Sequence, residues 1–210
     1  IPMLPRVLSE NLCSLTTGTD KLAFSVVWKM NRKAEILDTW IGRTIIRSCG
    51  QLAYSTAQKV IDGEEITEEE CRNDNSGDNS IIKLMCNDIT LLNNLATILR
   101  KERFKQGSIE LDSVQLSFEL DDEQLPIAVK KYERTTAHFL VEDFMLLANC
   151  TVGNYIFDHY PNNSLLRMHA PPQNDRMAEF TKLWSILDFK FDFTSSKTFH
   201  DSLQAIQKKT

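Results

Sequence analysis

The hydrophobic and polar positions near the amino-terminal end of the chain follow the pattern of strands. Residues 22–30 read L-A-F-S-V-V-W-K-M and residues 36–48 read I-L-D-T-W-I-G-R-T-I-I-R-S, two runs rich in β-branched and aromatic side chains. Such runs favour strands, and the polar N-R-K after the first favours a turn. We therefore predict a β-hairpin, with Gly42 as a candidate for a bulge in its second strand.

A longer apolar pattern between residues 81 and 106 has the period of a helix. Its apolar positions recur at alternating spacings of four and three: Met85, Ile89, Leu92, Ala96 and Leu99. Basic residues crowd the last turns, where they suit the negative end of the helix dipole, and Gly107 follows as a stop. Helix termination explains this basic end; contact with nucleic-acid phosphates is the other interpretation.

The pattern elsewhere mixes short helices, strands and long helices. We predict these further elements: a short helix over 55–61, an acidic surface loop over 64–80, strands over 109–120 and 127–132 with a turn at 121–124, a long helix over 135–160 that Pro161 stops, a loop over 162–174, a helix marked by Met177, Phe180, Trp184 and Leu187, an extended stretch over 189–193, and a last helix capped by Ser195 or Ser196. Hairpins mixed with long helices, and no linker dividing two domains, predict an α+β fold.

Composition places the chain among ordinary folded proteins. Of its 210 residues 42% are hydrophobic and 25% are charged. No apolar run reaches the roughly 18 residues that a membrane span needs. Five scattered cysteines without a C-x-x-C pair indicate reduced thiols and a reducing compartment. The irregular start I-P-M-L-P, without an initiator Met, suggests a piece of a longer polypeptide.

The net charge of −5 is unevenly distributed. Residues 62–78 carry eight acidic and one basic side chain, so this segment alone contributes −7 and the remainder is mildly basic. The overall charge therefore says little about partners. The acidic segment could serve a protein-interaction scaffold, which we keep as the weakest of the functional hypotheses.

The run L-V-E-D-F-M-L-L-A-N, residues 140–149, places three polar groups inside a largely apolar helix. On a helical wheel Glu142 and Asn149 lie about 20° apart, whereas Asp143 points about 100° away from them. Little of the circumference is polar, so we predict that this helix is buried. Glu142 could then be a structural carboxylate bonded to an arginine or to backbone amides, or an acceptor that lines a polar channel. The pattern leaves both open.

Motifs for several catalytic chemistries are missing. The sequence contains no G-x-x-x-x-G-K-[ST], no G-x-G-x-x-G and no H-E-x-x-H, and its four histidines lack the spacing of metal ligands. Asp121 and Asp122 fall in a predicted turn, where solvation explains them. A two-metal nuclease needs several carboxylates that converge on one cleft. We therefore assign no catalytic and no metal-binding residue within the chain.

Longer motifs resemble the RNase II (RNB) family. The start I-P-M-L-P-R-V-L-S-E-N-L-C-S-L, followed by D-K-L-A-F-S-V-V-W, resembles the segment just past the catalytic centre of that family. Residues 140–149 resemble its V-E-E-F-M-L-L-A-N helix, and residues 164–172 resemble its A-x-L-R-x-H-x-x-P motif. W-I-G-R-T-I-I-R-S is most similar to the eukaryotic cytoplasmic branch that works apart from the exosome, which includes a fungal group that has lost catalysis and regulates mRNA.

The resemblance implies an internal piece of an RNB domain spanning residues 1–210. The family hydrolyses single-stranded RNA processively from 3′ to 5′, with magnesium held by aspartates in a D-x-x-x-x-x-D-x-D-D pattern. By the resemblance these aspartates precede the chain, and a region with an essential arginine follows it. The family's V-E-E helix contributes a glutamate near the RNA ribose, which by order is Glu142. We therefore expect the RNA-binding residues Glu142, Asn149, Asp143, Arg167 and His169.

Two main functional hypotheses follow from the resemblance. The first is a cytoplasmic exoribonuclease that acts on single-stranded RNA and needs neither a membrane nor an obligate protein partner. The second is a catalytically inactive RNA-binding protein on the same fold. The aspartates that would decide between them lie outside residues 1–210. Asp143 also stands where the family usually has a second glutamate, so its role is open.

Overall fold

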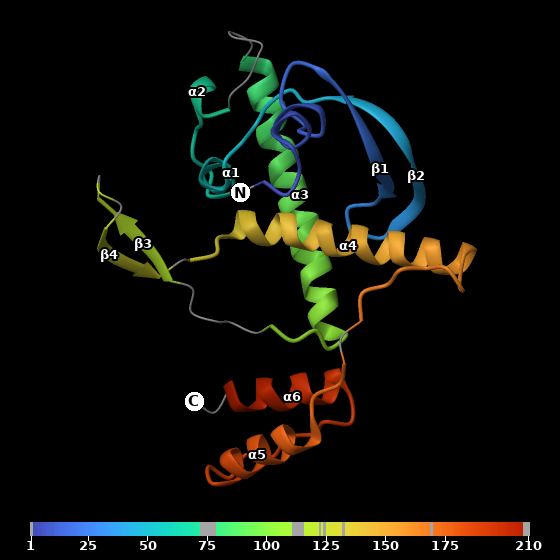
Figure 1. Cartoon of the computed structure of the whole chain (residues 1–210), viewed down its shortest axis with the longest axis vertical. Coiled ribbons are helices and arrows are strands. Elements are labelled where there is room, and N and C mark those ends of the chain that lie inside the picture. The colour runs from blue at the N-terminus through green and yellow to red at the C-terminus, as the bar shows by residue number, and fades with distance from the viewer. Residues whose placement is uncertain are drawn as a thin grey trace. The chain divides into compact units, whose positions relative to one another are not determined.

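The computed structural model describes residues 2–71, 79–110, 116–121, 123, 125–131, 133–168 and 170–207. After a short π-helix, Val7–Leu12, the elements follow in this order: β1 (Asp20–Met30), β2 (Ile36–Arg47), α1 (Tyr54–Ile61), α2 (Glu68–Cys71), α3 (Asn79–Lys105), β3 (Leu116–Leu120), β4 (Pro126–Lys131), α4 (Thr136–His159), α5 (Asn174–Ser185) and α6 (Ser196–Gln207) (Figure 1). Long helices and antiparallel hairpins confirm the predicted α+β class.

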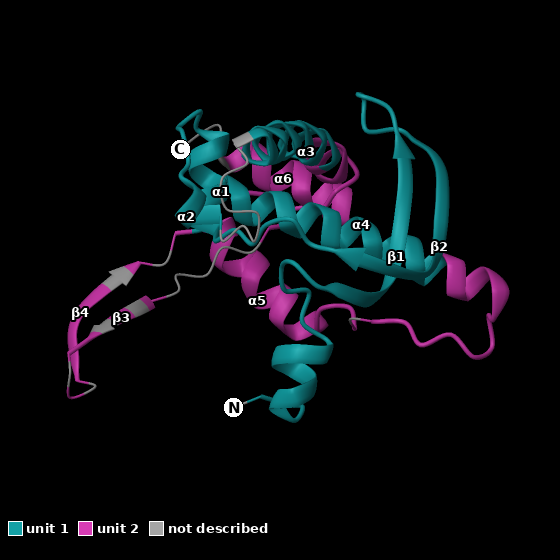
Figure 2. Ribbon diagram, turned by 90° about the horizontal axis from the view of Figure 1, so that it is seen from above, with its two compact units in different colours: residues 1–99, 134–154 teal, residues 100–133, 155–210 magenta. Residues whose placement is uncertain are grey.

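The chain forms two compact units (Figure 2). The first contains Ile1–Leu99 and Arg134–Asn154, and the second contains Arg100–Glu133 and Tyr155–Thr210. Helices α3 and α4 are continuous across the division, so each contributes to both units. Two of the three crossings between the units thus fall within helices, where the sequence offers no linker as a boundary signal.

The β1–β2 hairpin confirms the predicted pair of strands. The strands pair antiparallel, and Gly42 lies in register opposite Ser25, so the expected bulge at Gly42 is wrong. The irregularity lies between Lys29 and Met30, beside the turn. Gly42 serves a different purpose, because a Cβ atom there would lie 2.4 Å from the ring of Trp40. The absence of a side chain lets the indole lie against the backbone.

The predicted acidic loop is only partly a loop. Residues 68–71 form α2, and Cys71 at its end is fully buried. The Cys71 carbonyl accepts a hydrogen bond from the Gln51 amide at 3.0 Å, and Lys59 pairs with Glu70 at 2.5 Å. This contact lowers the pKa of Glu70 and raises that of Lys59. The acidic composition of this segment therefore led to a loop prediction, although residues 68–71 are packed. Residues 72–78 lie outside the described part.

Several predicted boundaries shift in the second unit. The strand predicted over 109–120 is shorter, since β3 begins at Leu116 and residues 109–110 are not in a strand; residues 111–115 are outside the described part. The stretch 189–193 forms no strand. Its phenylalanines instead pack with α5 and α6, and the ring centroids of Phe180 and Phe191 lie 5.0 Å apart. Ser195 caps α6 as expected, because its hydroxyl accepts a hydrogen bond from the Thr198 amide.

Gly107, just past the end of α3, packs against the backbone at the start of α6. Its φ of +98° is in the left-handed region that favours glycine, which confirms its predicted role as a helix stop. It is also buried, and a Cβ atom would lie 2.6 Å from the Cα and the nitrogen of Lys197. The second unit therefore depends on glycine here for two reasons, conformation and close approach.

We predict that Gly107→Ala destabilises the second unit more than conformation alone requires. The matched control is Gly63→Ala, because Gly63 has a similar φ of +83° but nothing within 4 Å of the added atom. The control should cost about 1–2 kcal/mol, and Gly107→Ala should cost more because the Lys197 backbone must move. Urea unfolding measures both losses, with hydrogen exchange followed in α6 for Gly107→Ala and in α1 for Gly63→Ala; equal losses would show that the approach to Lys197 is unimportant.

Candidate functional site

The first turn of α4 is held by a local capping arrangement. The Thr135 amide donates to Nδ1 of His138 at 3.2 Å, and the Thr135 hydroxyl lies 2.8 Å from the same nitrogen. The bond from the Thr135 amide is one half of a capping box, in which histidine replaces the usual Glu or Gln. Arg134 precedes the cap, and its guanidinium carbon lies 4.6 Å from the centroid of Phe139. That contact joins the two positions of a hydrophobic staple, with an arginine in place of an apolar residue.

Helix α1 supplies a second set of contacts to the same turn. The Ala137 amide donates to Oε1 of Gln58 at 3.0 Å, and Ala137 is buried. The rings of Tyr54 and His138 stack with centroids 4.0 Å apart and an interplanar angle of 15°. Because the first amides of a helix have no partner within it, Gln58 satisfies a donor that would otherwise be buried alone. Helix α1 therefore fixes where α4 begins.

A pocket of about 400 Å³ lies beside this junction in the first unit. Residues of α1, α3 and α4 line it with mostly apolar surface; they include Ala57, Leu92 and Leu140. Further along α4, Nε1 of Trp28 donates to the Thr151 hydroxyl at 3.3 Å, which ties β1 to the helix. Helix α4 is thus anchored at its start by α1 and near its middle by the hairpin.

The three polar groups of α4 have three different environments. Glu142 forms an ion pair with Arg134, and its side chain is 30% exposed. Asp143, the next residue, is buried, with 4% of its surface exposed. Asn149 is exposed. The predicted geometry is thereby confirmed, since Glu142 and Asn149 both reach the surface whereas Asp143 points elsewhere.

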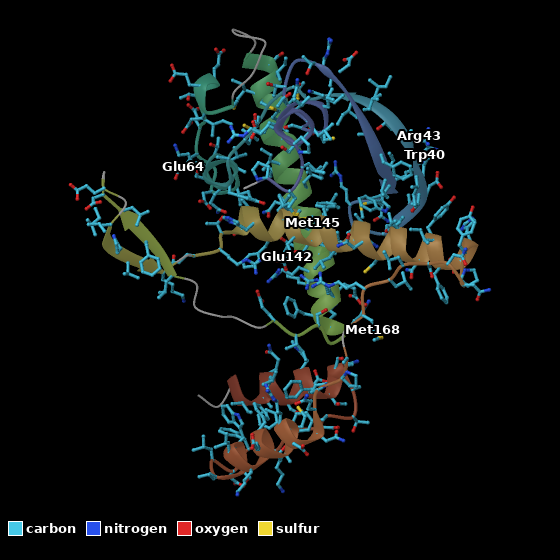
Figure 3. All side chains as sticks on the ribbon, in the orientation of Figure 1. Trp40, Arg43, Glu64, Glu142, Met145 and Met168 are labelled. Atoms are coloured by element: carbon cyan, nitrogen blue, oxygen red, sulfur yellow. The ribbon has the colours of Figure 1, made fainter. Side chains whose placement is uncertain are left out.

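The prediction that α4 is buried all round is wrong. Met145, which lies on α4 with Glu142 (Figure 3), is 59% exposed, and Val141 and Leu146 are also exposed. A helical wheel counts apolar residues but does not show how much of the chain covers them. The ion pair with Arg134 is the structural interpretation that the sequence had left open for Glu142, and the partial exposure of its carboxylate keeps the binding interpretation open as well.

Arg167 and His169 are the remaining candidates. Arg167 is exposed in the segment between α4 and α5, within the second unit, and His169 lies outside the described residues. Asp121 accepts hydrogen bonds from the amides of Glu123 and Leu125, as expected of a turn residue. The structure thus brings Glu142, Asp143 and Asn149 together on one helix, and Arg167 belongs to the other unit.

The contacts that sequence reasoning missed are those of Gln58, Tyr54 and Arg134. The signal for the cap was present, because Thr135 and His138 have the spacing of a capping box. Arg134 and Glu142 are eight residues apart, outside the i,i+4 spacing that predicts helix ion pairs. Gln58 and Ala137 are 79 residues apart. Contacts at such a separation leave no local pattern.

Metal and thiol chemistry find little support in the described part of the chain. There, no group of three or more His, Cys, Asp or Glu side chains could hold a metal ion. All five cysteines are free, and burial raises the pKa of the Cys71 thiol, so that this group stays protonated. Within the same residues, no helix has both the length and the apolar content for a membrane span.

The fold and the site define an α+β domain in which one anchored helix presents a carboxylate paired with a guanidinium. A model of the RNB domain family matches residues 1–210. The chain therefore belongs to the RNB domain family, which confirms the resemblance seen in the sequence.

Two curated relatives and one solved structure show the extent of the similarity. The DIS3-like exonuclease 2 of Schizosaccharomyces pombe is 41% identical over 97% of this chain, and the match covers 22% of that protein. A protein named Inactive exonuclease DIS3L2 from Arabidopsis thaliana is 39% identical over 98% of the chain, which is 19% of its own length. Mycoplasma genitalium RNase R, solved with ribose methylated single-stranded RNA, has a TM-score of 0.82 at 20% identity over 98% of this chain and 31% of its own.

We predict that Gln58→Ala lowers the free energy of unfolding by about 1–3 kcal/mol, because the buried Ala137 amide loses its acceptor. Gln58→Glu should recover only part of this loss, since it keeps an acceptor at the helix amino terminus but places a second carboxylate beside Asp62. Gln58 also donates to Asp62 at the surface. The control Asp62→Ala removes only that bond and should change stability by about 0.5 kcal/mol or less. Urea unfolding compares the variants; equal losses for Gln58→Ala and Asp62→Ala would contradict the capping role.

Proposed function

We propose that this chain is the part of an RNB-family 3′→5′ exoribonuclease that binds single-stranded RNA. The single observation that carries the proposal is the partly exposed Glu142 carboxylate on an anchored helix, in a chain whose relatives are named exonucleases. The solved relative in complex with single-stranded RNA supports RNA as the ligand. The chain spans about a fifth of the curated relatives it matches, so the activity proposed is that of the complete protein.

The chemistry proposed for Glu142 is the acceptance of a hydrogen bond from a ribose 2′-hydroxyl. A carboxylate has about four lone-pair sites, so it can accept from a guanidinium and from a second donor at once. DNA lacks the 2′-hydroxyl, which makes this contact a means of distinguishing RNA from DNA. Anchoring of α4 by Gln58 and the cap would hold the carboxylate at a fixed place along the RNA.

The other candidate residues keep secondary roles in the proposal. Asn149 is exposed and lies near the direction of Glu142, so it can offer an amide to RNA. Arg167 is exposed and suits a phosphate. His169 is proposed from the resemblance alone. Asp143 is buried, which favours a structural role over direct RNA contact.

The proposed cofactor of the complete protein is magnesium, and its proposed location is cytoplasmic. The described residues of this chain do not fit a magnesium site, since they offer no cluster of three or more ligand side chains. What this chain contributes is therefore the holding of RNA by its own residues. Any hydrolytic step would use groups that the RNB resemblance places in the aspartate pattern.

The second candidate function is an inactive RNA-binding protein on the same fold. A relative named as an inactive exonuclease is 39% identical to this chain, close to the 41% of a relative named as active. Identity over these residues therefore cannot separate the two functions. An intact D-x-x-x-x-x-D-x-D-D pattern in the complete protein would favour the exoribonuclease, and its loss would favour the inactive binder.

We predict that Glu142→Gln, in the longest polypeptide the gene encodes, weakens binding to single-stranded RNA by about 1–3 kcal/mol. The substitution keeps the size and one acceptor oxygen but removes the charge. Affinity for DNA of the same sequence should change much less. Fluorescence anisotropy with the two labelled oligonucleotides measures the ratio of affinities.

Asp143→Asn is the control for the Glu142 experiment, because Asp143 is adjacent in sequence but buried. It should leave the RNA-to-DNA ratio nearly unchanged, whatever it does to the melting temperature. Equal losses for RNA and DNA on Glu142→Gln, with a lower melting temperature, would show that Glu142 is only structural. A larger change in the ratio at Asp143 would show that the binding face was assigned wrongly.

We also predict that the purified 210-residue chain does not shorten RNA by itself. The reason is that phosphodiester hydrolysis of this kind needs carboxylates that converge on metal ions, and the described residues provide none. The test is incubation of 5′-labelled single-stranded RNA with the chain and magnesium. Magnesium-dependent shortening of the labelled RNA would contradict the prediction if the activity persists when the chain is purified further.

A further inference from the structure

Arg134 makes two contacts at once, although it lies outside α4 itself. Its guanidinium donates to Oε2 of Glu142 and lies over the ring of Phe139. Thr135, the next residue, is fixed by the bonds between its amide and hydroxyl and His138. The backbone of Arg134 is thus set by the cap, and its side chain is set by an aromatic face and a carboxylate. The side chain remains 41% exposed.

Exposed ion pairs of this kind contribute little to stability, about 0–1 kcal/mol. A small gain in stability is therefore a poor explanation for a guanidinium that is aligned by both a ring and a carboxylate. The alignment has a clearer effect on Glu142, whose long side chain would otherwise sample several rotamers. A planar guanidinium restricts a carboxylate more than an ammonium does, because its donors have fixed directions.

The local charge has a second consequence for RNA binding. A lone carboxylate on an RNA-binding surface repels the phosphates that flank every ribose. With Arg134 beside it, the pair is neutral, so a ribose can approach Glu142 without that repulsion. Neutralisation serves RNA and DNA alike, so the part of the effect of Arg134 that is specific to RNA is the orientation of Glu142.

We propose that Arg134 is the positioning residue for Glu142, and that it sets the preference for RNA over DNA without reading the ribose itself. This inference rests on the proposed ribose contact of Glu142. The competing explanation is that Arg134 binds a phosphate directly, which would serve RNA and DNA alike. A third explanation is that Arg134 only stabilises the start of α4 through Phe139.

The experiment is a double-mutant cycle on the RNA-to-DNA affinity ratio, with Arg134→Gln, Glu142→Gln and both together in the longest polypeptide the gene encodes. If Arg134 acts through Glu142, Arg134→Gln should lower the ratio by about fivefold or more. The double variant should have the ratio of Glu142→Gln alone, because nothing remains to be positioned. Arg32→Gln is the matched control, since Arg32 is an exposed arginine in the β1–β2 turn.

Arg134→Lys separates orientation from charge. Lysine keeps the positive charge but lacks the planar group that lies on Phe139. If positioning is the role, the lysine variant should bind DNA as the native protein does, yet keep a lowered RNA-to-DNA ratio. If charge alone matters, the lysine variant should bind both RNA and DNA as the native protein does.

Four outcomes decide the inference. A lowered ratio in Arg134→Gln, with no further loss in the double variant, supports it. Equal weakening of RNA and DNA, with a salt slope reduced by about 0.7, overturns it in favour of a phosphate contact. A lower melting temperature with an unchanged ratio overturns it in favour of a structural role. An unchanged ratio in Glu142→Gln would show that Glu142 does not contact the ribose, so the positioning role of Arg134 would fail as well. This failure is distinguishable from the other two.

Discussion

The Ala137 amide at the start of α4 must find a hydrogen-bond acceptor, and the contact between α1 and α4 meets that requirement. The amide is buried, and a helix cannot satisfy its own first donors. Gln58 of α1 provides the acceptor, and Tyr54 of the same helix stacks on His138 of the cap. Displacing α1 would therefore leave a buried donor unpaired and separate two stacked rings. The position of α1 and that of the amino-terminal end of α4 are thus coupled.

Fixing the start of α4 also fixes what each later side chain faces. Glu142 and Asp143 are chemically similar neighbours, but the 100° turn between successive residues sends one to the surface and the other into the interior. A shift of α4 by one residue would move one of these carboxylates into the environment of the other. The anchoring at Gln58 and at Trp28 prevents such a shift. Precise capping and a usable surface carboxylate are therefore consequences of the same contacts.

Local pattern predicted most of the elements but not the contacts between them. The β1–β2 hairpin, α3 with its Gly107 stop and the extent of α4 follow from periodicity and turn chemistry, which act over a few residues. Cys71 was missed because one buried side chain is hidden by acidic neighbours, and acidic composition usually indicates a loop. The wheel correctly separated Glu142 from Asp143, but the partners Arg134 and Gln58 come from outside the helix and depend on tertiary packing.

The charge of the chain has to be considered at the scale of a few ångströms. The net charge of −5 would disfavour RNA if it were spread evenly, but the acidic excess is concentrated in residues 62–78. Screening limits the reach of that segment to about 8–10 Å at physiological salt. At α4 the charges to consider are those of Glu142 and Arg134, which form a pair with no net charge that still presents polar groups. A neutral pair with an exposed carboxylate can discriminate by hydrogen bonding without repelling phosphates. Under the proposed ribose contact, specificity for the sugar would depend on orientation rather than on attraction to the backbone.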